Sequence, residues 1–272
     1  MLLLAFSLVT LAGACTGLGA ALVLCNCVKQ DNNALLGGAL GFSAGVMLYV
    51  TFIEIFRKSL DGFAESGLAG DQSSGPVYAV ATLTFFAGVL LMFGMEKLVN
   101  CLNKQDDQLS RMGFMTALAI GIHNFPEGVA TFVATLHDPS FGVMMAFAIG
   151  MHNIPEGMCV AMPLYYADGK RGKAFMWALV SGVSEPIGAA LAYAVLTEHM
   201  GPTAFGIVFG LVGGMMTYIC LHELIPTAHR YDPKDKVVTN CIILGMVVMA
   251  LSLIGFSIEV ATPSITTNIT NN

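Results

Sequence analysis

The chain alternates long apolar runs with short polar stretches. Each run holds about 20 or more mostly apolar residues, the length that an α-helix needs to cross the hydrocarbon core of a bilayer. The predicted runs are 2–28, 34–56, 77–99, 112–136, 142–166, 173–196, 204–228 and 238–260. The pattern therefore predicts an all-α membrane protein of eight transmembrane helices, with one membrane domain over residues 1–272.

The composition agrees with this pattern. Of 272 residues, 56% are hydrophobic and only 11% are charged, and the mean hydropathy is +0.73. A soluble domain usually has about 25% charged residues. The first run starts at Met1 without a basic segment and continues to about Val28, so we expect a retained span and not a cleaved signal peptide.

Basic residues are distributed unevenly among the predicted loops. Eight spans would put both termini on one face, which also holds Arg57 and Lys58. The other ten basic residues fall in loops on the opposite face: Lys29, Lys97, Lys104, Arg111, Lys170, Arg171, Lys173, Arg230, Lys234 and Lys236. Because Lys and Arg are retained on the cytoplasmic side, both termini are predicted to be extracytoplasmic.

One hexapeptide occurs twice, in the middle of two consecutive runs. His-Asn-Phe-Pro-Glu-Gly begins at His123, and His-Asn-Ile-Pro-Glu-Gly begins at His152. Residues four apart share a helix face, so Glu127 and Glu156 should each lie on the same face as the His of their own copy. The proline before each Glu removes a backbone N–H and displaces a carbonyl. In lipid, such groups persist only inside protein or beside a wet cavity, so the motif indicates an interior path.

Three other runs carry polar side chains at membrane depth. Glu185 precedes a proline in mid-run, and His222 and Glu223 stand nearer the cytoplasmic end of theirs. The second run has a stripe at helical spacing, formed by Ser43, Met47, Thr51 and Glu54. A charged side chain at a helix centre costs about 2.5–3.5 kcal/mol on insertion scales. Several carboxylates without partners would be a heavy burden, which a shared divalent cation would offset.

Two features allow more than one interpretation. Glu54 lies near the outer end of its run, where it could either bind metal or pair with Arg57 or Lys58. Cys25 and Cys27 could form a metal relay or could serve packing. The seven cysteines are odd in number and scattered, which argues against a disulfide framework.

The ligand set restricts the metal. Imidazole with carboxylate and amide oxygen suits zinc, iron(II), manganese(II) or cobalt(II). The hexapeptides contain no thiolate, which argues against copper(I), and their imidazoles argue against magnesium and calcium. Since His and Glu bind metal only when deprotonated, protons should compete with the ion. We expect these ions to be transported cargo, with no catalytic cofactor.

At these residues the sequence resembles the ZIP family of metal-ion transporters, most closely its bacterial ZupT branch. The resemblance implies a two-metal site on the fourth and fifth spans and alternating access that carries metal toward the cytosol. One ion would be held by His123, Glu127, His152 and Glu156, with Met47 nearby. The second would be held by Asn124, Glu127, Asn153, Glu156 and Glu185. His222 and Glu223 resemble the family's inner exit site.

Other function classes fit the sequence less well. An intramembrane hydrolase or di-iron enzyme could use the same ligands, but a His-Glu-x-x-His zinc motif would need a second His where Pro226 stands. A metal sensor would need a reporting segment that the sequence lacks. The expected partners are divalent metal ions and the lipid bilayer of the cell membrane. Nucleic acid is not expected, and a homodimer is possible.

Overall fold

The computed structural model describes residues 1–67, 74–102, 108–196 and 201–261, and these residues form a helical bundle without a β-strand. Apolar side chains dominate each segment, so the backbone must satisfy its own hydrogen bonds within the helix. In chain order the elements are α1 (Leu2–Ala20), η1 (Ala21–Leu24), α2 (Asn33–Val50), η2 (Thr51–Ile55), α3 (Phe56–Glu65), α4 (Gly75–Leu102), α5 (Gln108–His137), α6 (Pro139–Asp168), α7 (Arg171–Gly182), α8 (Ser184–Leu191), η3 (Ala192–Leu196), α9 (Pro202–Tyr218), η4 (Ile219–Leu224), α10 (Ile225–Tyr231) and α11 (Val238–Ala261).

The all-α prediction is confirmed, and each predicted run corresponds to one continuous helical segment. Six of the described helical segments are long and apolar enough to cross a membrane. Helices α5 and α6 are not among the six, although each has 30 residues, about 45 Å of helix. Both carry a polar hexapeptide, which lowers their hydropathy. The number of eight membrane crossings therefore stays a prediction.

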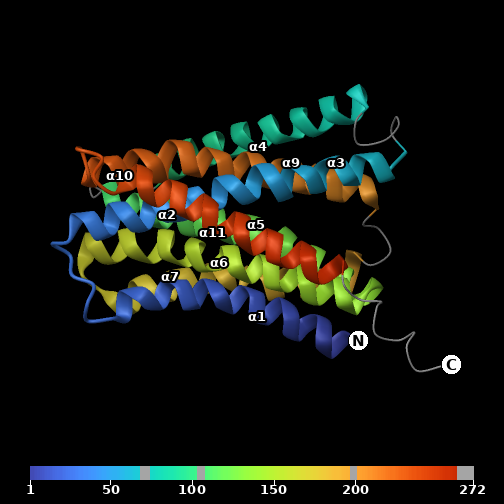
Figure 1. The fold of residues 1–272 in the computed structure, drawn as a ribbon, viewed down its shortest axis with the longest axis horizontal. Coiled ribbons are helices and arrows are strands. Elements are labelled where there is room, and N and C mark those ends of the chain that lie inside the picture. The colour runs from blue at the N-terminus through green and yellow to red at the C-terminus, as the bar shows by residue number, and fades with distance from the viewer. Residues whose placement is uncertain (68–73, 103–107, 197–200, 262–272) are drawn as a thin grey trace.

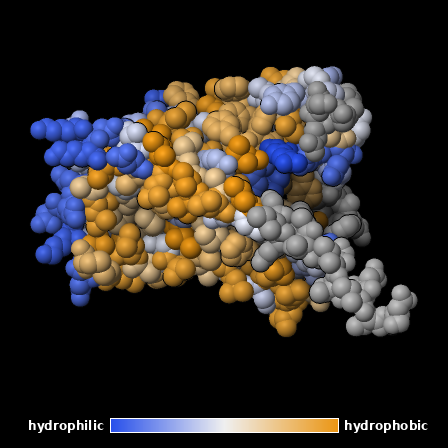
Figure 2. All heavy atoms as spheres, viewed as in Figure 1, coloured by the Kyte–Doolittle hydropathy of each residue, from blue (hydrophilic) through white to orange (hydrophobic). Residues whose placement is uncertain are grey.

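The two ends of the bundle differ in polarity. The N-terminus and the C-terminal end of α11 lie at one end, which we call the terminal end (Figure 1). Hydrophilic residues gather at the opposite end, the basic end, and a hydrophobic belt separates the two (Figure 2). Most of the predicted cytoplasmic basic residues belong to the loops and helix ends there, while Lys104 lies outside the described residues. That the basic end faces the cytosol remains a prediction.

The helices pack as two groups. Helices α1, α5, α6, α7 and α8 make their most extensive contacts with one another, and we call them the site group. Helices α2, α3, α4, α9, α10 and α11 do the same, and we call them the frame group. The main contact between the groups is that of α2 with α6. The bundle is therefore two packed bodies that share a seam.

Close helix contacts within each group depend on facing glycines. On α1 and α6, a Cβ at Gly19 would lie 1.8 Å from the carbonyl oxygen of Ile154, and one at Gly157 would lie 1.8 Å from that of Thr16. Four further facing pairs are Gly13 with Gly182, Gly128 with Gly188, Gly45 with Gly245, and Gly88 with Gly214. Each pair joins two helices of the same group, so none of them bridges the seam. Small residues let membrane helices approach closely, which makes each group a tightly packed unit.

Candidate metal centre

The two hexapeptides meet at the centre of the site group. Helices α5 and α6 continue through Pro126 and Pro155 and pack against each other. His123 Nε2 lies 2.8 Å from Glu156 Oε1, and His152 Nε2 lies 3.4 Å from Glu127 Oε1. Each His thus pairs with the Glu of the other helix. Two imidazoles and two carboxylates are gathered at one place, as the shared helix faces predicted.

These four side chains are fully buried, and many of their polar atoms have no hydrogen-bond partner. All four residues, and the neighbouring Asn153 and Glu185, have 0% exposure. The atoms without a hydrogen bond are His123 Nδ1, both ring nitrogens of His152, both carboxylate oxygens of Glu127, Asn153 Oδ1 and Glu185 Oε2. A buried polar group without a partner costs about 1–3 kcal/mol. Such a concentration of donor atoms is the chemistry that a divalent cation would satisfy.

The asparagines tie the two pairs to their surroundings. With its amide nitrogen turned toward Glu156, Asn124 donates to Glu156 Oε2 at 3.2 Å and to the backbone oxygen of Ile120 at 2.9 Å. Asn153 donates to the backbone oxygen of Ala12 at 2.9 Å and to Glu185 Oε1. Among the predicted ligands of the second ion, Asn124 is thus hydrogen-bonded to Glu156, and Asn153 to Glu185.

The glycine that ends the first hexapeptide explains how Glu185 comes near. A Cβ at Gly128 would lie 2.1 Å from the backbone oxygen of Glu185, so α5 and α8 can approach only because this residue has no side chain. The sequence contains this signal, because the glycine directly follows Glu127. Sequence analysis did not assign it a role.

The second span contributes from across the seam. Ser43 donates to the backbone oxygen of Pro155 at 2.8 Å, which fastens α2 to α6 beside the second hexapeptide. Met47 is fully buried one turn further on. Glu54 lies on η2, a π-helical turn, and its Oε1 accepts from Lys58 Nζ at 2.8 Å. The structure thus forms the Glu54–Lys58 pair, one of the two alternatives left by the sequence.

A second cluster of metal-type ligands lies in the frame group at the basic end. His222 Nδ1 is 3.4 Å from Glu96 Oε2 and 3.6 Å from Glu223 Oε1, and each of the three residues has one ligand atom within 4.8 Å of the others. Tyr218 donates to Glu96 and stacks on the His222 ring. Sequence analysis predicted His222 and Glu223 but missed Glu96, whose neighbour Lys97 makes it look like an ordinary interfacial charge.

The Cys25 and Cys27 pair behaves differently from both interpretations of the sequence. The structure joins the two residues in a disulfide. Their Cα atoms are 5.3 Å apart, which is within the usual range for a disulfide. The bond closes a turn after η1 and links no two helices.

Comparison with known proteins places this geometry in context. Residues 100–253 match the family model described as ZIP zinc transporter. A zinc transporter ZupT of Chlorobium chlorochromatii is 42% identical, over 94% of this chain and 98% of the relative. Proteins of the same name from Oceanobacillus iheyensis and Nitratidesulfovibrio vulgaris are 44% and 45% identical, each over 93% of this chain and over 98% and 97% of the relative, respectively.

Proposed function

This chain belongs to the ZIP zinc transporter family, and from that premise we propose that it carries zinc across the membrane toward the cytosol. The chemistry of the ligands extends the proposal to iron(II), manganese(II) and cobalt(II). The observation that carries it is the pair of cross-helix contacts, His123 with Glu156 and His152 with Glu127, in a fully buried place. Membership of a transporter family does not support the hydrolase or di-iron enzyme considered from the sequence.

The donor atoms support two neighbouring ions. The first would be bound by His123, Glu127, His152 and Glu156, with the Met47 thioether as a further ligand from α2. The second would be bound by Asn124, Glu127, Asn153, Glu156 and Glu185. Burial makes each carboxylate expensive as a lone charge, so cation binding and carboxylate ionisation should support each other.

The two groups suggest how access alternates. All candidate ligands of the two ions except Met47 belong to the site group, which could move as one body because facing glycines hold its helices together. The seam with the frame group has no such pair among the described glycines. We propose that movement along this seam exposes the ions first at the terminal end and then at the basic end. There Glu96, His222 and Glu223 would receive them.

Uptake of metal by the purified protein in sealed vesicles tests the proposal. Glu127→Ala and His152→Ala should each abolish zinc accumulation. Each substitution removes one buried ligand and leaves the ligand on the opposite helix without its partner. Both variants should still be found in the membrane in normal amounts. Asp31→Asn, in an exposed loop, should accumulate zinc like the original protein and serves as the matched control. Normal uptake by both site variants would contradict the proposal.

A further inference from the structure

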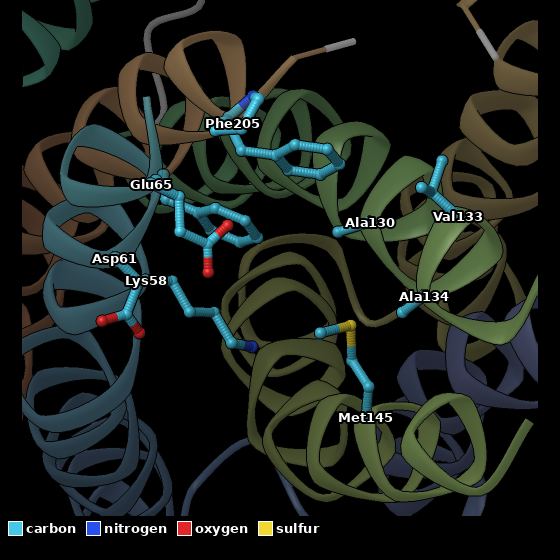
Figure 3. Close-up of a pocket in the computed structure, with 11 residues that line it drawn as sticks. Lys58, Asp61, Glu65, Ala130, Val133, Ala134, Met145 and Phe205 are labelled. Carbon is cyan, nitrogen blue, oxygen red and sulfur yellow. The ribbon is translucent and has the colours of Figure 1, made fainter. Parts of the chain in front are cut away.

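A cavity opens on the seam near the terminal end of the bundle. Its volume is about 460 Å³. Its walls come from α3 and α9 of the frame group and from α5 and α6 of the site group (Figure 3). Lys58, Asp61 and Glu65 supply the charged groups of this wall, and the other lining residues are uncharged. Lys58 is therefore the only cation among the residues that line the cavity.

Helical spacing connects the cavity with the candidate metal centre. On α5, Ala130 and Ala134 line the cavity and follow Glu127 by three and seven residues, so all three lie on one face. On α6, Met145 lines the cavity seven residues before His152. The cavity thus begins about one to two helical turns from the buried His and Glu pairs.

Lys58 stands on this route. Its side chain extends from α3 toward α6 in Figure 3, and the Glu65 carboxylate also turns into the space. Lys58 Nζ lies 2.8 Å from Glu54 Oε1 and 5.4 Å from the centre of the Phe209 ring. The Lys58 and Glu54 side chains are only 20% and 17% exposed. The second carboxylate oxygen of Glu54 is buried without a hydrogen-bond partner.

The Glu54–Lys58 ion pair also interacts with the candidate metal centre. Glu54 is close enough to His152 and Glu127 for an electrostatic interaction with both. The Lys58 ammonium acts on Glu127 as well. A divalent ion that arrives through the cavity would therefore meet a positive charge that already occupies the Glu54 carboxylate. The Lys58 ammonium and the metal ion would compete for the same carboxylate oxygen atoms of Glu54.

We infer that the Lys58 ammonium pairs with the Glu54 carboxylate until a divalent metal ion displaces it from there. Lys58 thereby sets how tightly metal binds at Glu54, beside the cavity. The inference rests on the proposed function. The flexible four-carbon stem of lysine would let the displaced ammonium move into the cavity toward Glu65. If the pair only stabilises the helix, as many i,i+4 pairs do, its removal would leave metal affinity unchanged.

Equilibrium zinc binding to the purified full chain, measured by competition with a fluorescent zinc indicator, tests the inference. Lys58→Met keeps most of the length of the side chain and removes its charge, and it should lower the zinc dissociation constant by about threefold to fivefold. Lys58→Arg keeps the charge and should bind within about twofold of the original protein. In a Glu54→Gln background, Lys58→Met should change affinity by less than about twofold.

Lys173→Met is the matched control. It breaks another lysine–carboxylate pair, with Lys173 Nζ 2.9 Å from Asp168 Oδ2 at the basic end, and should leave zinc affinity unchanged. An unchanged dissociation constant in Lys58→Met would overturn the inference, as would a full gain in the Glu54→Gln background. Flux measurements separate the two proposals. A chain that binds zinc but accumulates none in vesicles contradicts the proposed transport, while the binding series still decides the role of Lys58.

Discussion

The site group and the frame group hold their metal-type ligands in opposite ways. In the site group, His123, Glu127, His152 and Glu156 are fully buried at the middle of α5 and α6. In the frame group, the cluster of Glu96, His222 and Glu223 lies at the basic end, and the His222 side chain is 52% exposed. A buried site can bind tightly and select, whereas a half-exposed cluster can release. In the proposed transport cycle, the site group would bind the cargo and the frame group would pass it on.

The same contrast extends to packing. Both groups use facing glycines internally, but the contact between them uses side chains, such as Ser43 of α2 against the backbone of α6. Backbone-to-backbone packing resists sliding because any displacement brings atoms into overlap. We therefore expect movement to be least restricted at the seam.

Gly157→Ala should break the site group. The new Cβ would lie 1.8 Å from the backbone oxygen of Thr16 on α1, and neither backbone can move without opening the group. Overpacking typically costs about 1–3 kcal/mol, and we expect a clash between two backbones to lie at the upper end of this range. We expect little folded protein by size-exclusion chromatography and no zinc uptake.

Gly94→Ala provides the control for that substitution. A Cβ at Gly94 on α4 would have no atom within 4 Å, so the change should leave folding intact and stabilise the helix by up to about 1 kcal/mol. If Gly157→Ala gave the same yield and uptake as Gly94→Ala, close packing within the site group would not be required.

Glu96→Gln should sharpen the distinction between binding and release. It removes one carboxylate from the basic-end cluster while the buried centre stays intact. Loss of a group that supports a metal site typically weakens function by 10–100-fold, and we expect about tenfold slower maximal uptake. The zinc concentration for half-maximal uptake should change by less than about twofold.

Tyr218→Phe offers a graded comparison. It keeps the ring that stacks on His222 and removes only the hydrogen bond to Glu96, so its effect on maximal uptake should be smaller. A large change in half-saturation with unchanged maximal uptake in Glu96→Gln would assign this cluster to binding and not to release.

Asp232→Ala should have the smallest effect, confined to stability. Hydrogen bonds from the backbone N–H of Val237 and its neighbours hold the pKa of Asp232 below its usual range. The ionised carboxylate thus contributes its full stabilisation of the start of α11 when the pH is above the ordinary Asp pKa of about 3.9. This contribution is lost as the pH falls through the lowered pKa of Asp232 in the folded protein. At pH 7 we expect the melting temperature to fall by about 2–4 °C.

Thermal unfolding at two pH values checks this last prediction. The difference between the original protein and Asp232→Ala should narrow as the pH is lowered below about 4, because both then lack a charged group at this position. A difference that stays constant down to low pH would mean that the carboxylate charge is not its cause. Zinc uptake at pH 7 should be unaffected.

Sequence reasoning predicted the helices and the chemistry better than the contacts. Apolar runs indicated each helical segment, and the repeated hexapeptide indicated which side chains would be gathered. Helical spacing shows which residues share a face, but it does not show which helix lies opposite. The pairing of His123 with Glu156, across α5 and α6, therefore needed the structure.

Glu96 shows a second limit. Next to Lys97 at the end of an apolar run, it has the pattern of a solvated interfacial pair. Only the packing of α4 against the segment that carries His222 reveals that its carboxylate joins a cluster. Likewise, the facing glycine pairs could not be predicted, because glycine is frequent in membrane helices and most glycines give no sign of their partner.

The π-helical turns of the frame group affect how a change in chain length would turn the residues that follow them around the helix axis. Glu54 lies in η2 (Thr51–Ile55), and His222 and Glu223 lie in η4 (Ile219–Leu224). Such a turn holds one surplus residue compared with an α-helical turn. Because the wider turn absorbs this surplus residue, loss of one residue there would restore an α-helical turn and leave the residues beyond it in nearly the same orientation. The same loss within the regular part of α2 would rotate everything beyond it by about 100°, so that Lys58 would leave the cavity wall and Gly62 would leave Gly206. The π-helical turn is thus the place in this segment where a one-residue change in length would be tolerated, while the α-helices on either side would not tolerate it.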